Sequence, residues 1–144
     1  MLLDKENDLT RQIIGCCFQI HTALGPGLDE KTYHKALIAL LRKSSLEFQT
    51  EKVYPIFFEN IRIGVKRFDL IVESKIIIEV KAVKNHMPDI YKNQLLSYLK
   101  ISELRVGLLV NFGNTRCIVR RYLNDPDIRV IRQHSCHSKK ELLT

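Results

Sequence analysis

Long apolar runs are missing from this sequence, and so are the marks of a secreted protein. No apolar stretch approaches the roughly 20 residues that a membrane-spanning helix needs, so a transmembrane protein is excluded. Residues 1–8 mix in acids early and lack the basic start and apolar stretch of a secretory signal. These absences predict a cytoplasmic protein with no membrane partner.

Cysteine is also sparse. The four cysteines are too few and too irregularly spaced to form a disulfide framework, and two of them are adjacent within a helical pattern. We therefore expect reduced, mostly buried thiols at Cys16, Cys17, Cys117 and Cys136. The tail residues His134, Cys136 and His137 have no second pair of donors at zinc-finger spacing, so no zinc site is expected.

The chain also lacks internal repeats, low-complexity tracts and interdomain linkers. Its 144 residues are enough for one ordinary domain with its own core, and we assign residues 1–125 to that domain and 126–144 to a short basic extension. The 23 Lys and Arg residues outnumber the 16 Asp and Glu residues, for a net charge of +7. This balance suits a polyanionic partner such as nucleic acid, although charge alone does not identify one.

Hydrophobic periodicity predicts two helices followed by strands. Apolar residues recur every three or four positions over 9–24, and a second helix is expected to start near Asp29 and to end near 43. Strands are expected at 53–58, 61–63, 68–72 and 76–80, then a helix after Pro88, then strands at 106–112 and 117–122. The order α-α-β-β-β-β-α-β-β predicts an α/β fold, a mixed sheet flanked by helices.

Charged residues end the most apolar of these strands. Glu79 and Lys81 share one face of the strand while Val80 points to the other. A three-residue loop that pairs Val72 with Ile76 would place Asp69 opposite Glu79. Two carboxylates and an ammonium would then meet on one patch.

Such a patch can hold Mg²⁺ or Mn²⁺, because hard cations prefer oxygen ligands. The metal would lower the pKa of a bound water and offset charge on a phosphoryl group. The alternative is a cross-strand salt bridge among Asp69, Glu79 and Lys81, which the residue types alone do not exclude.

The spacing from Asp69 to Glu79-Val80-Lys81 resembles the D-x(n)-E-x-K core of the PD-(D/E)XK nuclease superfamily. The resemblance implies a restriction-endonuclease-like fold, in which both acids and the Val80 carbonyl bind metal. It also implies that Lys81 positions the attacking water.

A second signature narrows the resemblance. Gly27, Glu30 and Tyr33 match the motif of the GxxExxY proteins, a branch of that superfamily. By this resemblance Glu30 is a further metal ligand, whereas stabilisation of the helix dipole is the alternative for it. For Tyr33 we favour a core-edge aromatic with a hydrogen-bonded hydroxyl.

Three further residues are candidate nucleic-acid contacts. Gln94 and Tyr98 lie four apart on one helical face and resemble the Q-x-x-x-Y element of RecB-like nucleases, with ordinary packing as the alternative. Lys84, just past the acidic strand, could contact phosphate or simply be solvated.

The function expected from these residues is a metal-dependent nuclease that acts on DNA or, less favoured, RNA. One alternative is a non-catalytic nucleic-acid-binding or accessory protein that retains the fold. Another is an interaction or oligomerisation module, and homodimer formation is left open.

Overall fold

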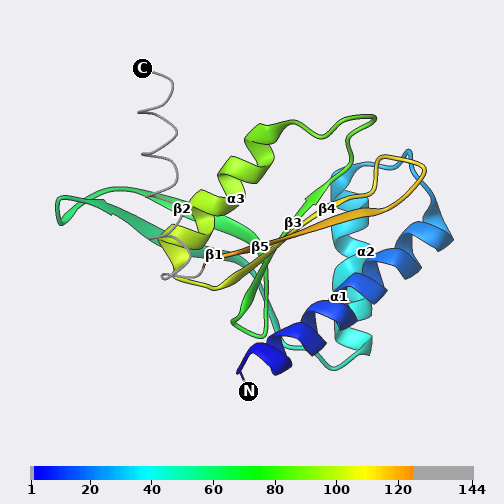
Figure 1. Ribbon diagram of the computed structural model, residues 1–144, viewed down its shortest axis with the longest axis horizontal. Helices are drawn as coiled ribbons and strands as arrows, with labels where there is room; N and C mark the ends of the chain where they lie inside the picture. The colour runs from blue at the N-terminus through cyan, green and yellow to red at the C-terminus, as the bar shows by residue number, and fades with distance from the viewer. Residues whose placement is uncertain (1, 125–144) are drawn as a thin grey trace, which may run out of the picture.

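A computed structural model gives the fold of residues 2–124, with side chains placed from residue 5 onward (Figure 1). The predicted extension 126–144, its strand-like segment 128–131 and the tail residues His134, Cys136 and His137 lie outside these residues. Cys16 and Cys17 are buried and Cys117 is half-buried, and all three are free thiols, as predicted.

A five-stranded sheet in the order β1-β2-β3-β4-β5 forms the centre of the described domain. The pairing of β3 with β4 is parallel and the other three pairings are antiparallel, so the predicted mixed sheet is confirmed. The strands are β1 (Phe48–Phe58), β2 (Ile61–Val72), β3 (Ile76–Lys81), β4 (Val106–Asn111) and β5 (Ile118–Leu123).

The prediction of separate strands at 61–63 and 68–72 was wrong. Both belong to β2, so the order is α-α-β-β-β-α-β-β. The intervening segment Gly64–Arg67 is extended and pairs with β1 at Val53–Ile56. Its glycine and basic residues mark a strand exposed to solvent rather than a turn, because the sheet is not covered on both faces there.

Helices cover the two faces of the sheet. The helices α1 (Leu2–Leu24) and α2 (Glu30–Lys43) pack on one face, and α3 (Asp89–Ser102) packs on the other (Figure 1). The Asp29 side chain caps α2 by accepting a 2.8 Å hydrogen bond from the Thr32 amide, which confirms the predicted start. Within residues 2–124, no helix has both the length and the hydropathy of a membrane span.

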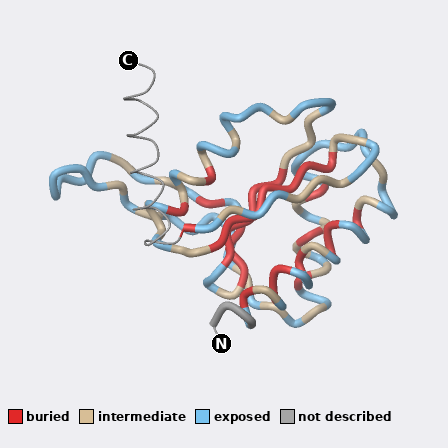
Figure 2. Tube along the Cα trace, viewed as in Figure 1, coloured by how far each residue is buried: buried red, intermediate tan, exposed pale blue. Residues whose placement is uncertain are grey.

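Two hydrophobic cores result, one on each face. The larger lies under α1 and α2, and the smaller lies under α3. Every residue of β4 is buried, as expected for a strand covered on both faces. Figure 2 shows the buried residues following the middle of the sheet and the inner sides of α1 and α2.

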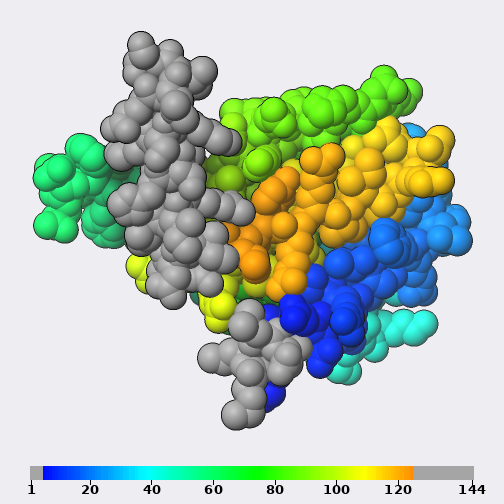
Figure 3. All heavy atoms as spheres, viewed as in Figure 1, coloured from blue at the N-terminus to red at the C-terminus, as the bar shows by residue number. Residues whose placement is uncertain are grey.

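The last residues of β1 and the first residues of β2 form an arm that projects beyond the helices (Figures 1 and 3). Its pairing shifts by one residue between Ile56 and Phe57. Phe57, Phe58, Ile61 and Ile63 are at least 60% exposed there, because none of the described helices covers them. The base of the arm is where β2 parts from β3.

Candidate metal and phosphoryl-transfer site

The site begins where the strands β2 and β3 separate. Val72 pairs with Ile76 and the pairing ends at Leu70 and Ile78, which confirms the predicted register up to one residue before Asp69 and Glu79. An opening therefore forms at the level of these two carboxylates.

The pairing of β2 with its other neighbour, β1, is also irregular at Asp69. The pairing of β1 with β2 skips Glu51 and Asp69, and Glu51 has a positive φ of 57°. Phe68 lies in the core under α3 whereas Leu70 lies in the core under α1 and α2, so the alternation of side chains breaks at Asp69. This break directs Asp69 toward the α2 side of the sheet, where it lines a groove.

Glu79 is the buried member of the site, with only 7% of its surface exposed. Burial raises the pKa of Glu79 to about 7, and the negative charge of Asp69 contributes in the same direction. The positive charges of Lys81 and Lys66 oppose this pKa shift, and Glu30 adds slightly to it. Four charged side chains from three elements therefore act on one buried carboxylate.

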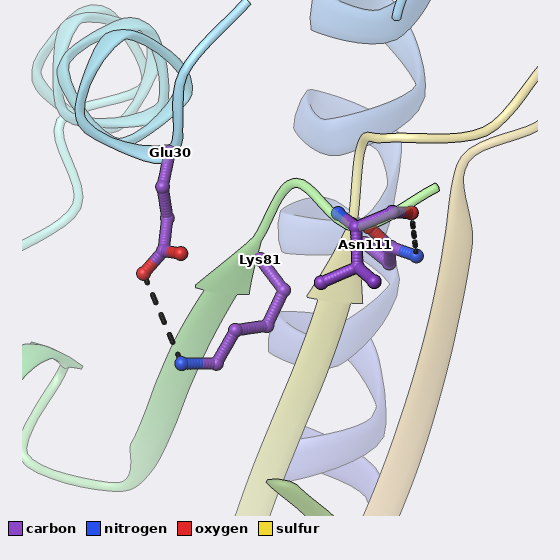
Figure 4. Close-up of polar contacts among 4 residues, drawn as sticks. Glu30, Lys81 and Asn111 are labelled. Atoms are coloured by element: carbon purple, nitrogen blue, oxygen red, sulfur yellow. Dashed lines mark hydrogen bonds and ion pairs between the residues drawn. The ribbon is translucent and has the colours of Figure 1, made fainter. Parts of the chain in front are cut away.

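Lys81 connects the two helical layers at the end of β3. Its Nζ lies 3.8 Å from Glu30 Oε1 on α2 and 4.4 Å from the ring centroid of Tyr91 on α3. Figure 4 shows Glu30 reaching down from α2 toward the Lys81 ammonium. Because Glu30 is half-exposed, this ion pair orients the two groups but adds little stability.

The Val80 carbonyl lies on the side of the opening. The Phe112 amide donates a 2.9 Å hydrogen bond to the Lys81 carbonyl, so the Lys81 carbonyl points toward β4. Backbone carbonyls alternate along a strand, and the Val80 carbonyl therefore points the other way, toward β2, beyond the last paired residues. Its position is compatible with the metal-ligand role that the resemblance implied.

The donors fit a hard divalent cation in part. Asp69, Glu79 and the Val80 carbonyl supply oxygens, and a bound cation would offset both the burial and the repulsion from Asp69 that raise the pKa of Glu79. Among residues 2–124, no three His, Cys, Asp or Glu side chains are grouped closely enough to hold a metal ion. Glu30 faces Lys81, and its role as a ligand stays a prediction.

Comparison with known proteins identifies the family. Residues 7–122 match the sequence profile described as the PD-(D/E)XK nuclease superfamily. The chain belongs to this superfamily. A search of curated proteins gave no match.

A crystal structure of SSO0001 is similar to the PD-(D/E)XK fold seen here. It superposes with a TM-score of 0.52 at 22% identity, and the match covers 92% of this chain. The match covers 66% of that protein, so this chain spans slightly less than two thirds of its length. At this identity the likeness shows the fold alone.

The raised pKa of Glu79 predicts how the stability of this PD-(D/E)XK domain depends on pH. The proton on Glu79 binds more tightly in the folded state than in the unfolded state. Protonated Glu79 therefore stabilises the fold fully below its usual pKa of 4.5, and this stabilisation is lost as the pH rises to about 7. The shift corresponds to roughly 3 kcal/mol of unfolding free energy. Urea unfolding in EDTA at pH 5 and pH 8 should show this loss in the wild type relative to Glu79→Gln. Parallel pH profiles for the two proteins would contradict the prediction.

Lys66 is a site residue that sequence reasoning missed. Its Nζ lies 4.3 Å from the ring centroid of Tyr98, and the Tyr98 ring packs edge-on against Phe68. Its contact with Tyr98 raises the pKa of Lys66 most, and the negative charges of Glu79 and Asp69 add to the rise, against the opposing effect of burial. The sequence carried no signal for this, because the contact joins β2 to a helix about 30 residues later.

Among the three candidate nucleic-acid contacts, Tyr98 is connected to the acidic site through Lys66. Gln94 is half-buried one turn earlier on α3, and Lys84 is exposed in the loop after β3. None of the ion pairs among the described residues involves Lys84. The substrate-binding roles of all three stay predictions.

Tyr33 supports the loop before α2, as the favoured alternative for it predicted. It is fully buried and stacks on Phe112 with ring centroids 4.6 Å apart. Its hydroxyl donates to the Gly25 carbonyl and accepts a 3.2 Å hydrogen bond from the Leu28 amide. The loop that turns at Gly27, with a φ of 108°, is thereby fixed directly before Glu30.

Two asparagines, also unassigned by sequence reasoning, hold the loop that follows Lys81. The Asn111 side chain accepts from the Val83 amide at 2.9 Å and donates to the Val83 carbonyl at 3.0 Å (Figure 4). Asn114 makes the equivalent pair of hydrogen bonds with Asn85, at 2.7 and 2.9 Å. The exit of the chain from the site is therefore tied to the end of β4.

Proposed function

We propose that this PD-(D/E)XK protein is a metal-dependent nuclease that hydrolyses phosphodiester bonds, in DNA rather than RNA. The observation that carries the proposal is the buried Glu79 carboxylate beside Asp69 and Lys81, where β2 and β3 separate. Burying a charged group is costly unless a partner or ligand stabilises it. Retention of this arrangement in a nuclease superfamily favours catalysis.

Each residue would have a distinct role. Asp69, Glu79 and the Val80 carbonyl, with Glu30 as a further candidate, would hold Mg²⁺ or Mn²⁺. The metal would supply Lewis-acid stabilisation of phosphoryl charge and a more acidic water. Lys81, oriented by Glu30 and Tyr91, would position that water by donating a hydrogen bond to its oxygen.

Features of the sequence and of the loop before Glu30 support a narrower family, a partner and substrate contacts. The roles of Gly27 and Tyr33 in shaping the loop before Glu30 support membership of the GxxExxY branch. The net charge of +7 supports a nucleic-acid partner. Lys84, Gln94 and Tyr98 are the proposed substrate contacts, the proposed location is the cytoplasm, and homodimer formation is left open.

One observation favours a second function, that of a non-catalytic nucleic-acid-binding protein. Glu30 forms an ion pair with Lys81. Within residues 2–124, no three Asp, Glu, His or Cys side chains lie close enough together to hold a metal ion. A protein that kept the fold and lost the metal would show the same pairing. The first function requires a divalent metal for cleavage, whereas the second predicts no cleavage with or without metal.

The test is cleavage of labelled single-stranded DNA, duplex DNA and RNA by the full chain with Mg²⁺, Mn²⁺ or EDTA. We expect cutting of DNA that requires the divalent metal. Because a ligand that binds only the folded state stabilises it, the metal should also raise the melting temperature. Binding without cutting under every condition would support the non-catalytic function instead.

A further inference from the structure

A groove of about 520 Å³ begins at the candidate site and runs between α2 and the sheet. Glu30, Asp69 and Val80 form one end, and Thr50 and Glu51 of β1 form the sheet wall. The groove is thus continuous with the proposed metal ligands. A substrate strand held at those ligands could continue into it.

The wall on α2 has the character of a phosphate-binding surface. Lys31, His34, Lys35 and Ile38 line it, and their spacing of three and four residues places them on one face of the helix. Both lysines are exposed, and neither forms an ion pair with any residue in the described part of the chain. Two ammonium groups are therefore available for an anionic ligand.

The chemistry changes along the groove in the order that a nucleic-acid strand requires. The carboxylates at the site can accept a phosphate only through a metal, whereas Lys31 and Lys35 attract phosphates directly. The two lysines are about 6 Å apart along the helix axis, which suits neighbouring phosphates of one extended strand. The ring of His34, between the two lysines on the helix, and the apolar side chain of Ile38, one turn beyond Lys35, offer surfaces for a base.

The size of the groove selects a single strand. Its volume lies in the range of roughly 300–1,000 Å³ typical of small-ligand sites, which accommodates one or two nucleotides. One strand is therefore enough to fill the space between α2 and β1, and the second strand of a duplex would have to lie outside it.

We propose that the groove between α2 and β1 binds an unpaired nucleic-acid strand next to the cleaved phosphate, with Lys31 and Lys35 contacting its backbone. This inference rests on the proposed function for the identity of the ligand. It implies that the preferred substrate has an unpaired stretch on one side of the cleaved bond. Blunt duplex would leave the groove empty.

The test compares two double variants that remove the same charge. Lys31→Gln/Lys35→Gln changes the groove, whereas Lys43→Gln/Lys75→Gln removes two exposed lysines outside it. Affinity for a labelled 12-nucleotide single strand and for a blunt duplex would be measured in EDTA at several salt concentrations. Neither pair includes a candidate metal ligand or Lys81.

We expect the groove variant to bind the single strand roughly tenfold more weakly near 0.15 M salt, with a salt slope smaller by about 1.4, because two phosphate contacts are lost. The control pair should retain affinity within about twofold, and duplex binding should change little in either variant. Equal losses in the two variants, or an equal loss for duplex and single strand, would overturn the groove assignment.

The outcome also separates the groove from the nuclease function. If the wild type binds the strand through the groove but cuts nothing with Mg²⁺ or Mn²⁺, the nuclease proposal fails and the groove stands. If the wild type cuts DNA while the groove variant binds the strand as tightly as the wild type, the groove proposal fails alone. Absence of any strand binding by the wild type would overturn the groove proposal, and the cleavage test would then decide the nuclease proposal by itself.

Discussion

Glu79→Gln is expected to abolish metal-dependent cleavage and yet to make the metal-free protein more stable than the wild type at pH 8. The amide removes a buried negative charge whose pKa is raised by burial and by Asp69, so folding becomes more favourable. The same change weakens the proposed metal site, because a neutral amide attracts a divalent cation less than a carboxylate does. Loss of activity would therefore not result from unfolding.

The measurement is cleavage of DNA under Mg²⁺ or Mn²⁺ beside urea unfolding in EDTA. Lys81→Ala should lower the cleavage rate by roughly 10²–10⁴-fold if it positions the attacking water. Lys75→Ala is the matched control, because Lys75 is an exposed lysine just before the opposite end of the same strand. Cleavage by Glu79→Gln within tenfold of the wild-type rate would exclude Glu79 as an essential ligand.

Gly113→Ala is expected to produce the largest loss of stability among single-methyl changes in the described domain. A Cβ at Gly113 would lie 2.4 Å from the Val83 amide nitrogen and 2.6 Å from the Ala82 carbonyl carbon. Both atoms belong to the backbone that Asn111 holds in place, so no side chain can move aside. Overpacking of this kind costs roughly 1–3 kcal/mol, and we expect the upper end of that range or more.

Thermal and urea unfolding would measure this loss, with Gly15→Ala as the matched control. The middle of α1 places no atom within 4 Å of a Cβ at Gly15, so alanine there should stabilise the protein by roughly 0.5–1 kcal/mol. Because the loop held at Gly113 follows Lys81 directly, Gly113→Ala should also reduce cleavage at temperatures where the protein stays folded. Equal stability of the two variants would contradict the close approach seen at Gly113.

Contacts with the end of β4 connect the loop after β3 to the site. Asn111, Asn114 and Gly113 bring the loop against the end of β4, and this holds the strand end that carries Lys81. Lys81 in turn lies between Glu30 on α2 and Tyr91 on α3. A displacement of the loop would therefore move the ammonium relative to both carboxylates.

Local sequence determined the part of the site that depends on short connections. The three-residue loop from Val72 to Ile76 fixes the register of β2 with β3, so Asp69 and Glu79 each lie one position beyond the last paired residues, Leu70 and Ile78. The apolar run of β3 and the charges at its end likewise predicted a buried strand with a functional terminus. Asp29 marked the start of α2 because capping depends on neighbouring residues alone.

The polar residues of Gly64–Arg67 led to the wrong prediction of a turn, because they reflect exposure to solvent and not a reversal of the chain. Gly64–Arg67 lies in the middle of one strand, and its polar character reflects the absence of a covering layer. Nothing in a single sequence separates an exposed strand from a turn when glycine and basic residues dominate both. The pairing of this segment with β1 shows that it is a strand.

Tertiary structure alone decided which distant residues join the site. Glu30 meets Lys81 across 51 positions and Lys66 meets Tyr98 across 32, and these separations follow from how α2 and α3 pack on opposite faces of the sheet. The groove beside α2 is likewise lined by Glu51 and Asp69, the two residues that the pairing of β1 with β2 skips. Strand register and helix capping depend on residues close in the sequence, so a local pattern can predict them. Contacts between layers depend on how whole helices and strands pack, and no local sequence pattern predicts that packing.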